Sequence, residues 1–152
     1  MGLSKWDRRY LAIAREVSCW SKDPSTKVGA VIADKRGRVV ALGFNGFAEN
    51  VQDCKKKLNH RETKYEMVVH AEVNAALIAG QSTEGGTIYV SGAAICPRCA
   101  SVLIQVGIKR AVAKEPCPST GVKWDKDGLI TLDMFREVGI EFEPADAEQI
   151  SN

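Results

Sequence analysis

The feature that most constrains the fold of this chain is a pattern in which a short histidine or cysteine motif opens an apolar helical segment. The pattern occurs twice, over residues 70–79 (HAEVNAALIA) and 96–106 (CPRCASVLIQV), and a glycine follows each segment. Residues 87–91 lie between the two segments and residues 109–113 follow the second, and both are predicted strands. Strands joined by a crossover helix pair in parallel, so the chain is predicted to form an α/β fold.

The N-terminal part is predicted to begin with an amphipathic helix over residues 5–20. Ser4 followed by Asp7 matches an N-terminal capping pattern. Large apolar residues recur every three or four positions, which is the spacing of one helix face. These residues are Trp6, Tyr10, Ile13, Val17 and Trp20.

The other elements complete a mixed sheet. Residues 45–66 are polar and are expected to be irregular, with the basic run 55–57 on a solvated loop. The remaining predicted elements are an antiparallel hairpin of strands 28–33 and 39–44, a helix over 129–138 and a strand over 140–143. Together these elements predict a three-layer α/β/α fold with a mixed five-stranded sheet.

Size, charge and cysteine usage narrow the class of protein. A chain of 152 residues fits one domain, and a net charge of +2 disfavours nucleic-acid binding by bulk electrostatics. No apolar run reaches the length of a membrane span, and the charged first helix does not resemble a secretory signal. Five cysteines are an odd number, so we expect free thiols in a cytoplasmic protein and not a disulfide framework.

The two motifs can supply a metal site. Helix N-termini stabilise thiolates, and residues three apart lie on one helix face, so Cys96 and Cys99 can bind one ion together. His70 adds a nitrogen, and this donor set suits Zn²⁺. Three protein ligands leave one coordination position open, which is the arrangement of a catalytic zinc. A structural zinc site with Cys54 or Cys117 as the fourth ligand is the alternative.

Glu72 is the candidate proton carrier beside this metal. It lies two positions after His70, too far round the helix to bind the same ion, yet near enough to reach the open position. Zinc lowers the pKa of a bound water from about 16 to about 7, and a carboxylate that moves protons adds a factor of roughly 10²–10⁴. A histidine and glutamate followed by paired cysteines is the signature of zinc nucleobase deaminases.

On these motifs the chain resembles the deoxycytidylate (dCMP) deaminases, a branch of the cytidine and deoxycytidylate deaminase superfamily. The resemblance covers residues 5–143 as the core of a single domain over 1–152, and leaves 144–152 as a short tail. It implies a cytidine-deaminase-like fold. The matching segments are Ser21–Ala30, Gly43–Gly46, Lys64–Tyr65, His70–Ala75, Cys96–Ala100, Gly107–Arg110 and Val138–Ile140.

The resemblance implies a zinc-dependent hydrolase that converts dCMP to dUMP and ammonia and so supplies dUMP for thymidylate synthesis. Zinc hydroxide would attack C4, and Glu72 would protonate N3 and then the departing amine. By similarity, Asn45 would hydrogen-bond the nucleotide, although an Asn-Gly pair is also an ordinary turn signal. The backbone N–H of Ala71 would meet the base carbonyl. One catalytic zinc ion per chain is expected.

The 5′-phosphate needs hydrogen-bond donors. We expect them in the segment before the first strand, from Lys22, Ser25, Thr26 and Lys27, with Arg98 as a further candidate.

Two regions depart from the family pattern. Ile95 stands where the family has proline before the first cysteine, and the approach from the preceding strand is about one residue longer, which affects placement of the base. Residues 114–126 match poorly, and Trp124 is the candidate for the aromatic residue over the base, or else a packing residue under the last helix.

Two alternatives stay open. One is a deaminase of another substrate, such as cytidine, deoxycytidine or an RNA base, and the modest charge disfavours the RNA base. The other is a zinc-stabilised binding module without turnover, which Glu72 disfavours. Relatives form dimers or hexamers, and many dCMP deaminases respond to dCTP and dTTP, so a homo-oligomer and these effectors are expected.

Overall fold

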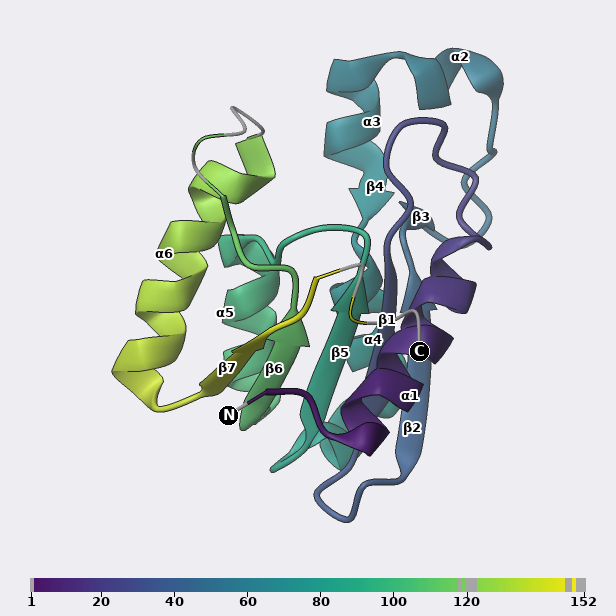
Figure 1. Cartoon of the computed structure of the whole chain (residues 1–152). Helices are drawn as coiled ribbons and strands as arrows, with labels where there is room; N and C mark the ends of the chain where they lie inside the picture. The colour runs from purple at the N-terminus through teal and green to yellow at the C-terminus, as the bar shows by residue number, and fades with distance from the viewer. Residues whose placement is uncertain (1, 118, 120–122, 147–148, 150–152) are drawn as a thin grey trace.

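A five-stranded mixed sheet forms the centre of the molecule (Figure 1). The computed structural model describes residues 2–117, 119, 123–146 and 149, and for residues 123–125 it describes the backbone alone. The order across the sheet is β2-β1-β5-β6-β7. The β1 strand pairs antiparallel with β2 and β5, whereas β5, β6 and β7 pair in parallel. The strands are β1 Gly29–Ala33, β2 Val39–Phe44, β5 Thr87–Ser91, β6 Arg110–Ala113 and β7 Glu141–Pro144.

Helices cover both faces of this sheet, as predicted. On one face α1 packs over β1 and β5, and its buried residues form a core with those strands. On the other face α4, α5 and α6 form a larger core with the same sheet. These helices are α1 Lys5–Ser18, α4 Ala71–Ala79, α5 Pro97–Gln105 and α6 Lys123–Val138. The three-layer α/β/α architecture is confirmed.

The segment expected to be irregular is instead partly helical. Residues 45–69 contain two short helices and a two-stranded ribbon, and η1 (Gly80–Thr83) is a further helical turn after α4. The basic run 55–57 lies in the first of these helices and not in a loop. Each helix is shorter than two full turns, so its apolar spacing gives little sequence signal. The elements are β3 Gly46–Phe47, α2 Lys55–Asn59, α3 Arg61–Met67 and β4 Val68–Val69.

The buried face of α1 differs from the predicted apolar stripe. The capping box of Ser4 and Asp7 is present as expected. Tyr10 and Val17 of the predicted stripe are buried, but Ile13 is exposed, Trp6 is 58% exposed, and Trp20, beyond the end of the helix, is 51% exposed. A Cβ atom on Gly29 of β1 would lie 2.0 Å from the carbonyl oxygen of Ala14, so helix and strand are too close for an indole between them.

One edge of the sheet gathers the segments that carry the motifs. Gly29, at the start of β1, pairs with Phe44 at the end of β2 and with Ser91 at the end of β5. The segments before β1, after β2 and after β5 therefore lie together. Ligands of open α/β sheets bind at this kind of edge, beyond the carboxyl ends of parallel strands. Within the described part of the chain, no helix is both long and apolar enough to cross a membrane.

Candidate active site

Three ligand side chains meet where two helices begin. His70 is the N-cap residue of α4, and Cys96 is the N-cap residue of α5. His70 Nδ1 lies 3.2 Å from Cys99 Sγ and 3.5 Å from Cys96 Sγ, and the three ligand atoms all lie within 4.8 Å of one another. The two sulfurs are buried at the helix N-terminus. The structure thus brings together the three residues that the sequence assigned to one metal.

This cluster fits a tetrahedral zinc ion. Zn–N and Zn–S bonds of about 2.0 and 2.3 Å at a tetrahedral angle place nitrogen and sulfur about 3.5 Å apart, close to the two distances observed. The mixed nitrogen and sulfur set is the one that zinc prefers. Among the described residues, neither Cys54 nor Cys117 belongs to the cluster. The structural-site alternative, with one of these thiols as fourth ligand, therefore has no support in the described part of the molecule.

The electrostatics of the cluster favour a negative sulfur. A hydrogen bond from the Cys99 thiol lowers the pKa of Cys96 to about 4 against the opposing effect of burial, and His70 lowers it further. The same contact with Cys96, together with burial, raises the pKa of Cys99. The hydrogen bond to Cys96 raises the pKa of His70. Without a metal, the pair of thiols therefore carries one negative charge, and a divalent cation would stabilise a second.

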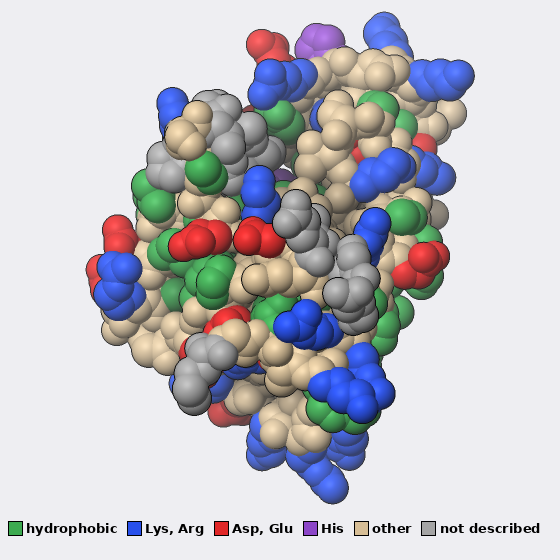
Figure 2. All heavy atoms as spheres, in the orientation of Figure 1, with side chains coloured by type: hydrophobic (Ala, Val, Ile, Leu, Met, Phe, Trp, Pro, Cys, Tyr) green, Lys and Arg blue, Asp and Glu red, His purple; other side chains and the backbone are tan. Residues whose placement is uncertain are grey.

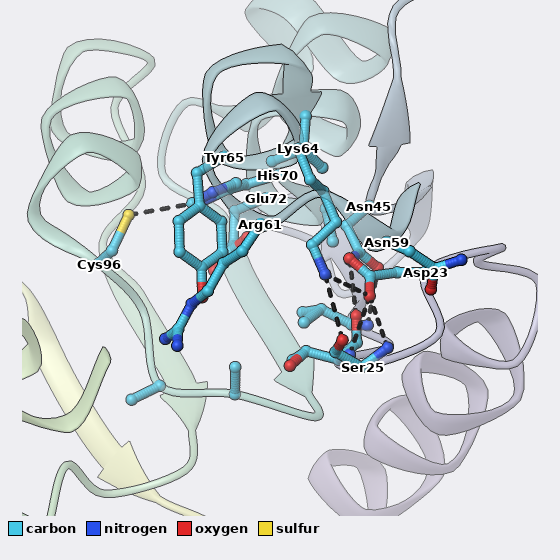
Figure 3. A pocket seen from close by; sticks show the side chains of 16 residues that line it. Asp23, Ser25, Asn45, Asn59, Arg61, Lys64, Tyr65, His70, Glu72 and Cys96 are labelled. Carbon is cyan, nitrogen blue, oxygen red and sulfur yellow. Dashed lines mark hydrogen bonds and ion pairs between the residues drawn. The ribbon is translucent and has the colours of Figure 1, made fainter. Parts of the chain in front are cut away.

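Glu72 lies beside the cluster and is only 3% exposed. Burial raises the pKa of its carboxyl group, because the charged form loses water, and this effect exceeds the lowering by His70. Figure 3 shows Glu72 next to His70 among the residues that line a cavity. A buried carboxyl group whose pKa is raised by desolvation is suited to accept a proton and to donate it again.

The cavity in front of this cluster has a volume of about 510 Å³, which is the size of a small-molecule site. It lies at the sheet edge described above, and Figure 2 shows a hollow in the upper half of the molecule beside α3. His70, Glu72 and Cys96 line it from one side, and Ala71 lies with them. As the first residue of α4, Ala71 has a backbone N–H with no partner within the helix.

Opposite the cluster, the segment before β1 lines the cavity through Ser25 and Thr26, two of the predicted substrate contacts. Asn45 holds this segment in place. Its Oδ1 accepts a hydrogen bond from the Val28 N–H at 2.9 Å, and its Nδ2 donates to the Thr26 carbonyl at 2.8 Å. Asn45 also lines the cavity. The turn and the functional interpretation of Asn45 are therefore compatible, since one side chain orders the segment and faces the cavity.

The third wall of the cavity comes from α3, which the sequence analysis did not identify. The spacing of Arg61, Lys64 and Tyr65 places all three on one side of this short helix, and all three line the cavity. Lys64 Nζ lies 3.1 Å from Asp23 Oδ1 and 3.3 Å from Ser25 Oγ. Asp23 Oδ1 also accepts the backbone N–H groups of Ser25 and Thr26. The Lys64-Tyr65 pair within the family motifs was the signal for these residues.

Two of the predicted phosphate donors lie elsewhere. Lys22 is exposed and forms an ion pair with Asp53 at 2.8 Å, and Lys27 Nζ donates to the carbonyl of Ser21. Neither residue lines the cavity. The expectation that both lysines join Ser25 and Thr26 at one anion site stays a prediction, and the described arrangement does not bring the four together. Neighbouring residues in an extended segment point in different directions, which sequence proximity does not reveal.

Three further residues singled out in the sequence are Arg98, Ile95 and Trp124. Arg98 lines a second cavity, of about 540 Å³, on the other flank of His70. Ile95, the departure from the family pattern, is buried, and its carbonyl accepts a hydrogen bond from Thr131 Oγ1 at 2.8 Å. The altered approach to Cys96 is thus anchored on α6. The side chain of Trp124, in α6, lies outside the described residues.

Known proteins resemble this chain in sequence. Residues 4–115 match the family model of the cytidine and deoxycytidylate deaminase zinc-binding region. An uncharacterised deaminase of Aliivibrio fischeri is 41% identical over 139 residues, which cover 91% of this chain and 92% of that protein. A probable deoxycytidylate deaminase of Drosophila melanogaster is 38% identical over 117 residues, which cover 70% of this chain and 58% of that protein.

A solved structure shares the fold. The dCMP deaminase of cyanophage S-TIM5, crystallised in complex with dCMP and dUMP, superposes with a TM-score of 0.74 at 22% identity. The superposition covers 95% of this chain and all of that one, so the described architecture is that of the deaminase fold.

Proposed function

Since the chain belongs to the cytidine and deoxycytidylate deaminase family, we propose that it converts dCMP to dUMP and ammonia by hydrolysis. One observation carries the proposal. The cluster of His70, Cys96 and Cys99 lies with the buried carboxyl group of Glu72 on one wall of a nucleotide-sized cavity. The choice of dCMP among the cytosine compounds is supported by the names of relatives, such as the probable deoxycytidylate deaminase of Drosophila melanogaster.

The proposed roles follow from the geometry. His70, Cys96 and Cys99 would hold one zinc ion, which when bound supplies a Lewis acid that makes water a good nucleophile near neutral pH. In the reaction a C4–O bond forms, the C4–N bond breaks and the amine leaves as ammonia. Glu72 takes a proton from the attacking water, delivers it to N3, and moves the second proton to the departing amine. Burial of Glu72 suits this exchange, because it keeps the carboxyl pKa raised.

Substrate placement would come from the opposite walls. Asn45 keeps one amide proton and one lone pair beyond its two hydrogen bonds to the segment before β1, so it can also bind the nucleotide. The Ala71 N–H would meet the base carbonyl, and the hydroxyl groups of Ser25 and Thr26 would meet the sugar or the phosphate.

A substrate panel tests the proposal. Zinc-loaded protein is incubated separately with dCMP, CMP, deoxycytidine, cytidine and single-stranded DNA, and ammonia release is measured. We expect turnover mainly on dCMP. Turnover of cytidine with none of dCMP would exclude the nucleotide assignment, and no turnover of any compound by protein carrying zinc would exclude a deaminase in favour of a binding module.

Further proposals concern assembly, regulation and location. The exposed apolar residues Trp6 and Ile13 on α1, and Leu77 and Ile78 on α4, support a homo-oligomer, a dimer or a hexamer. A smaller cavity of about 230 Å³ beside the turn after β2 shares a wall with the substrate cavity and is a candidate site for dCTP or dTTP. One domain over 1–152 and a cytoplasmic location stay predictions.

A further inference from the structure

We propose that Arg61 is the residue by which this site selects a nucleotide over a nucleoside, because among the described cations that line the cavity its guanidinium group is the one without a carboxylate partner and can bind the 5′-phosphate. The inference rests on the proposed deaminase function and names the residue that sets its substrate class. Lys64, the other cation on the same wall, serves a different purpose, since it positions the segment before β1.

Three of the cations around the cavity are already engaged. Lys22 is paired with Asp53, Lys27 donates to the Ser21 carbonyl, and neither lysine lines the cavity. Lys64 is 6% exposed and is neutralised by Asp23, whose side chain is equally buried. Loss of Asp23 would leave a buried, unpaired charge on Lys64 and would strongly destabilise the fold, so we expect the two side chains to stay paired. The pair adds no net charge for a phosphate.

Arg61 lines the same cavity, unlike Lys22 and Lys27, and no described carboxylate neutralises it, unlike Lys64. No carboxylate of the described residues lies within ion-pair distance of its guanidinium group. Its Nε donates to the Tyr65 hydroxyl at 2.9 Å, and its guanidinium carbon lies 5.3 Å from the centre of the Tyr65 ring. These contacts orient the group and leave both terminal nitrogens as donors. Two parallel N–H groups are the arrangement that binds a phosphate with two hydrogen bonds.

The place of Arg61 on α3 fits this role (Figure 3). Lys64 fixes the helix to the segment before β1 through Asp23 and Ser25. Arg61 lies about one turn earlier on the same side and is exposed, whereas Lys64 is buried, so the Arg61 guanidinium group is accessible to an incoming phosphate. A nucleotide with its base near His70 would extend its 5′ end away from the metal cluster.

The test compares two substrates in matched variants. The value of kcat/KM is measured for dCMP and for deoxycytidine in wild type, Arg61→Gln, Arg61→Lys and Lys56→Gln. Lys56 is an exposed cation of α2 that lines none of the described cavities, so Lys56→Gln controls for a general loss of positive charge. We expect Arg61→Gln to lower kcat/KM for dCMP about 10- to 100-fold and to leave deoxycytidine unchanged. Arg61→Lys should recover part of the loss, and Lys56→Gln should change neither substrate.

Other outcomes would overturn the inference without touching the deaminase assignment. An equal loss for both substrates in Arg61→Gln would make Arg61 a structural residue of α3. An unchanged kcat/KM for dCMP in that variant would place the phosphate elsewhere. Absence of any turnover by zinc-loaded wild type would instead reject the proposed function. Zinc content and thermal unfolding of each variant show that the fold is intact.

Discussion

At the scale of single residues, the chemistry depends on where two acidic groups lie. Glu72 is buried beside the metal cluster, and burial raises its pKa. Asp23 is also buried but accepts hydrogen bonds from Lys64 and from two backbone N–H groups. The carboxyl group of Glu72 can exchange a proton, whereas that of Asp23 holds the cavity wall in place through its hydrogen bonds. The same side-chain chemistry therefore serves catalysis in one place and positioning in the other.

Replacing Glu72 with glutamine tests its catalytic role. Glu72→Gln keeps the shape of the side chain and removes proton transfer, so we expect kcat to fall by a factor of roughly 10²–10⁴. Zinc content by elemental analysis should not change, because Glu72 is not among the clustered ligands. Glu62→Gln, at an exposed position of α3, is the control and should retain full activity. Normal turnover by Glu72→Gln would remove Glu72 from the mechanism.

At the scale of elements, the site depends on close contact between β2 and α4. A Cβ atom on Gly43 would lie 2.4 Å from the carbonyl oxygen of Ala71 and 2.6 Å from the backbone nitrogen of Ala75. Asn74 Nδ2 also donates to the carbonyl of Phe44 at 2.8 Å. The strand therefore sets the depth at which α4 begins, and α4 carries His70 at its N-cap.

A methyl group at Gly43 should push these elements apart. We expect Gly43→Ala to lower the free energy of unfolding by about 1–3 kcal/mol, and to lower activity because α4 shifts. Gly46→Ala is a matched control in the same part of the chain, since a Cβ atom at Gly46 meets nothing within 4 Å. Denaturant unfolding followed by circular dichroism measures both variants. Equal free energies of unfolding for the two variants would show that β2 and α4 can accommodate the methyl group without loss of stability.

At the scale of the whole molecule, a charge network centred on the buried carboxylate of Asp7 joins elements from both ends of the chain. Asp7 in α1 accepts hydrogen bonds from both terminal nitrogens of Arg110, at 2.6 and 3.1 Å, and from the Tyr89 hydroxyl at 3.0 Å. Arg110 also donates to Glu141 in β7. Burial alone would raise the pKa of Asp7, but the hydrogen bonds from Arg110, Ser4 and Tyr89 outweigh it and lower the pKa to about 2.

This network makes the free energy of unfolding depend on pH. Because the pKa of Asp7 is lower in the folded state, its stabilisation is present above pH 4 and is lost as the pH falls toward about 2. At pH 7 we expect Asp7→Asn to lower the free energy of unfolding by about 2 kcal/mol. The difference from wild type should shrink below pH 4. Asp133→Asn, which removes an exposed ion pair with Arg136, should show a small, pH-insensitive change. A constant difference for Asp7→Asn at every pH would contradict this account.

Metal binding should stabilise the whole fold. The ligands come from the starts of α4 and α5, so one ion would tie two helices together. Binding at a thousand times the dissociation constant adds about 4 kcal/mol, so chelation should lower Tm and zinc should restore it. Cys99→Ala should lose this response, whereas Cys19→Ala, with an exposed thiol, should keep it. An unchanged Tm on chelation of zinc-loaded protein would argue against the site.

The sequence by itself determined the order of the main strands and helices, the sheet they form, and the residues that meet at the metal cluster. His70 and Cys96 were predictable because each opens a helix, and a helix start depends on a few neighbouring residues. The hairpin of β1 and β2 was predictable because its strands and the polar loop between them are also set by neighbouring residues. These are local properties, and the three-layer fold follows from them through general rules of chain connection.

The tertiary structure alone decided which charges line the cavity. Lys22 and Lys27 lie next to Ser25 and Thr26 in sequence but not in the site, whereas Lys64 reaches it from α3. The face that α1 buries was likewise set by packing, because its close approach to Gly29 brings Ala14 and Ser18 against the sheet and leaves Trp6 exposed. Each outcome depends on contacts between residues far apart in the chain. Local spacing carries no information about such contacts, because they form only when the layers pack.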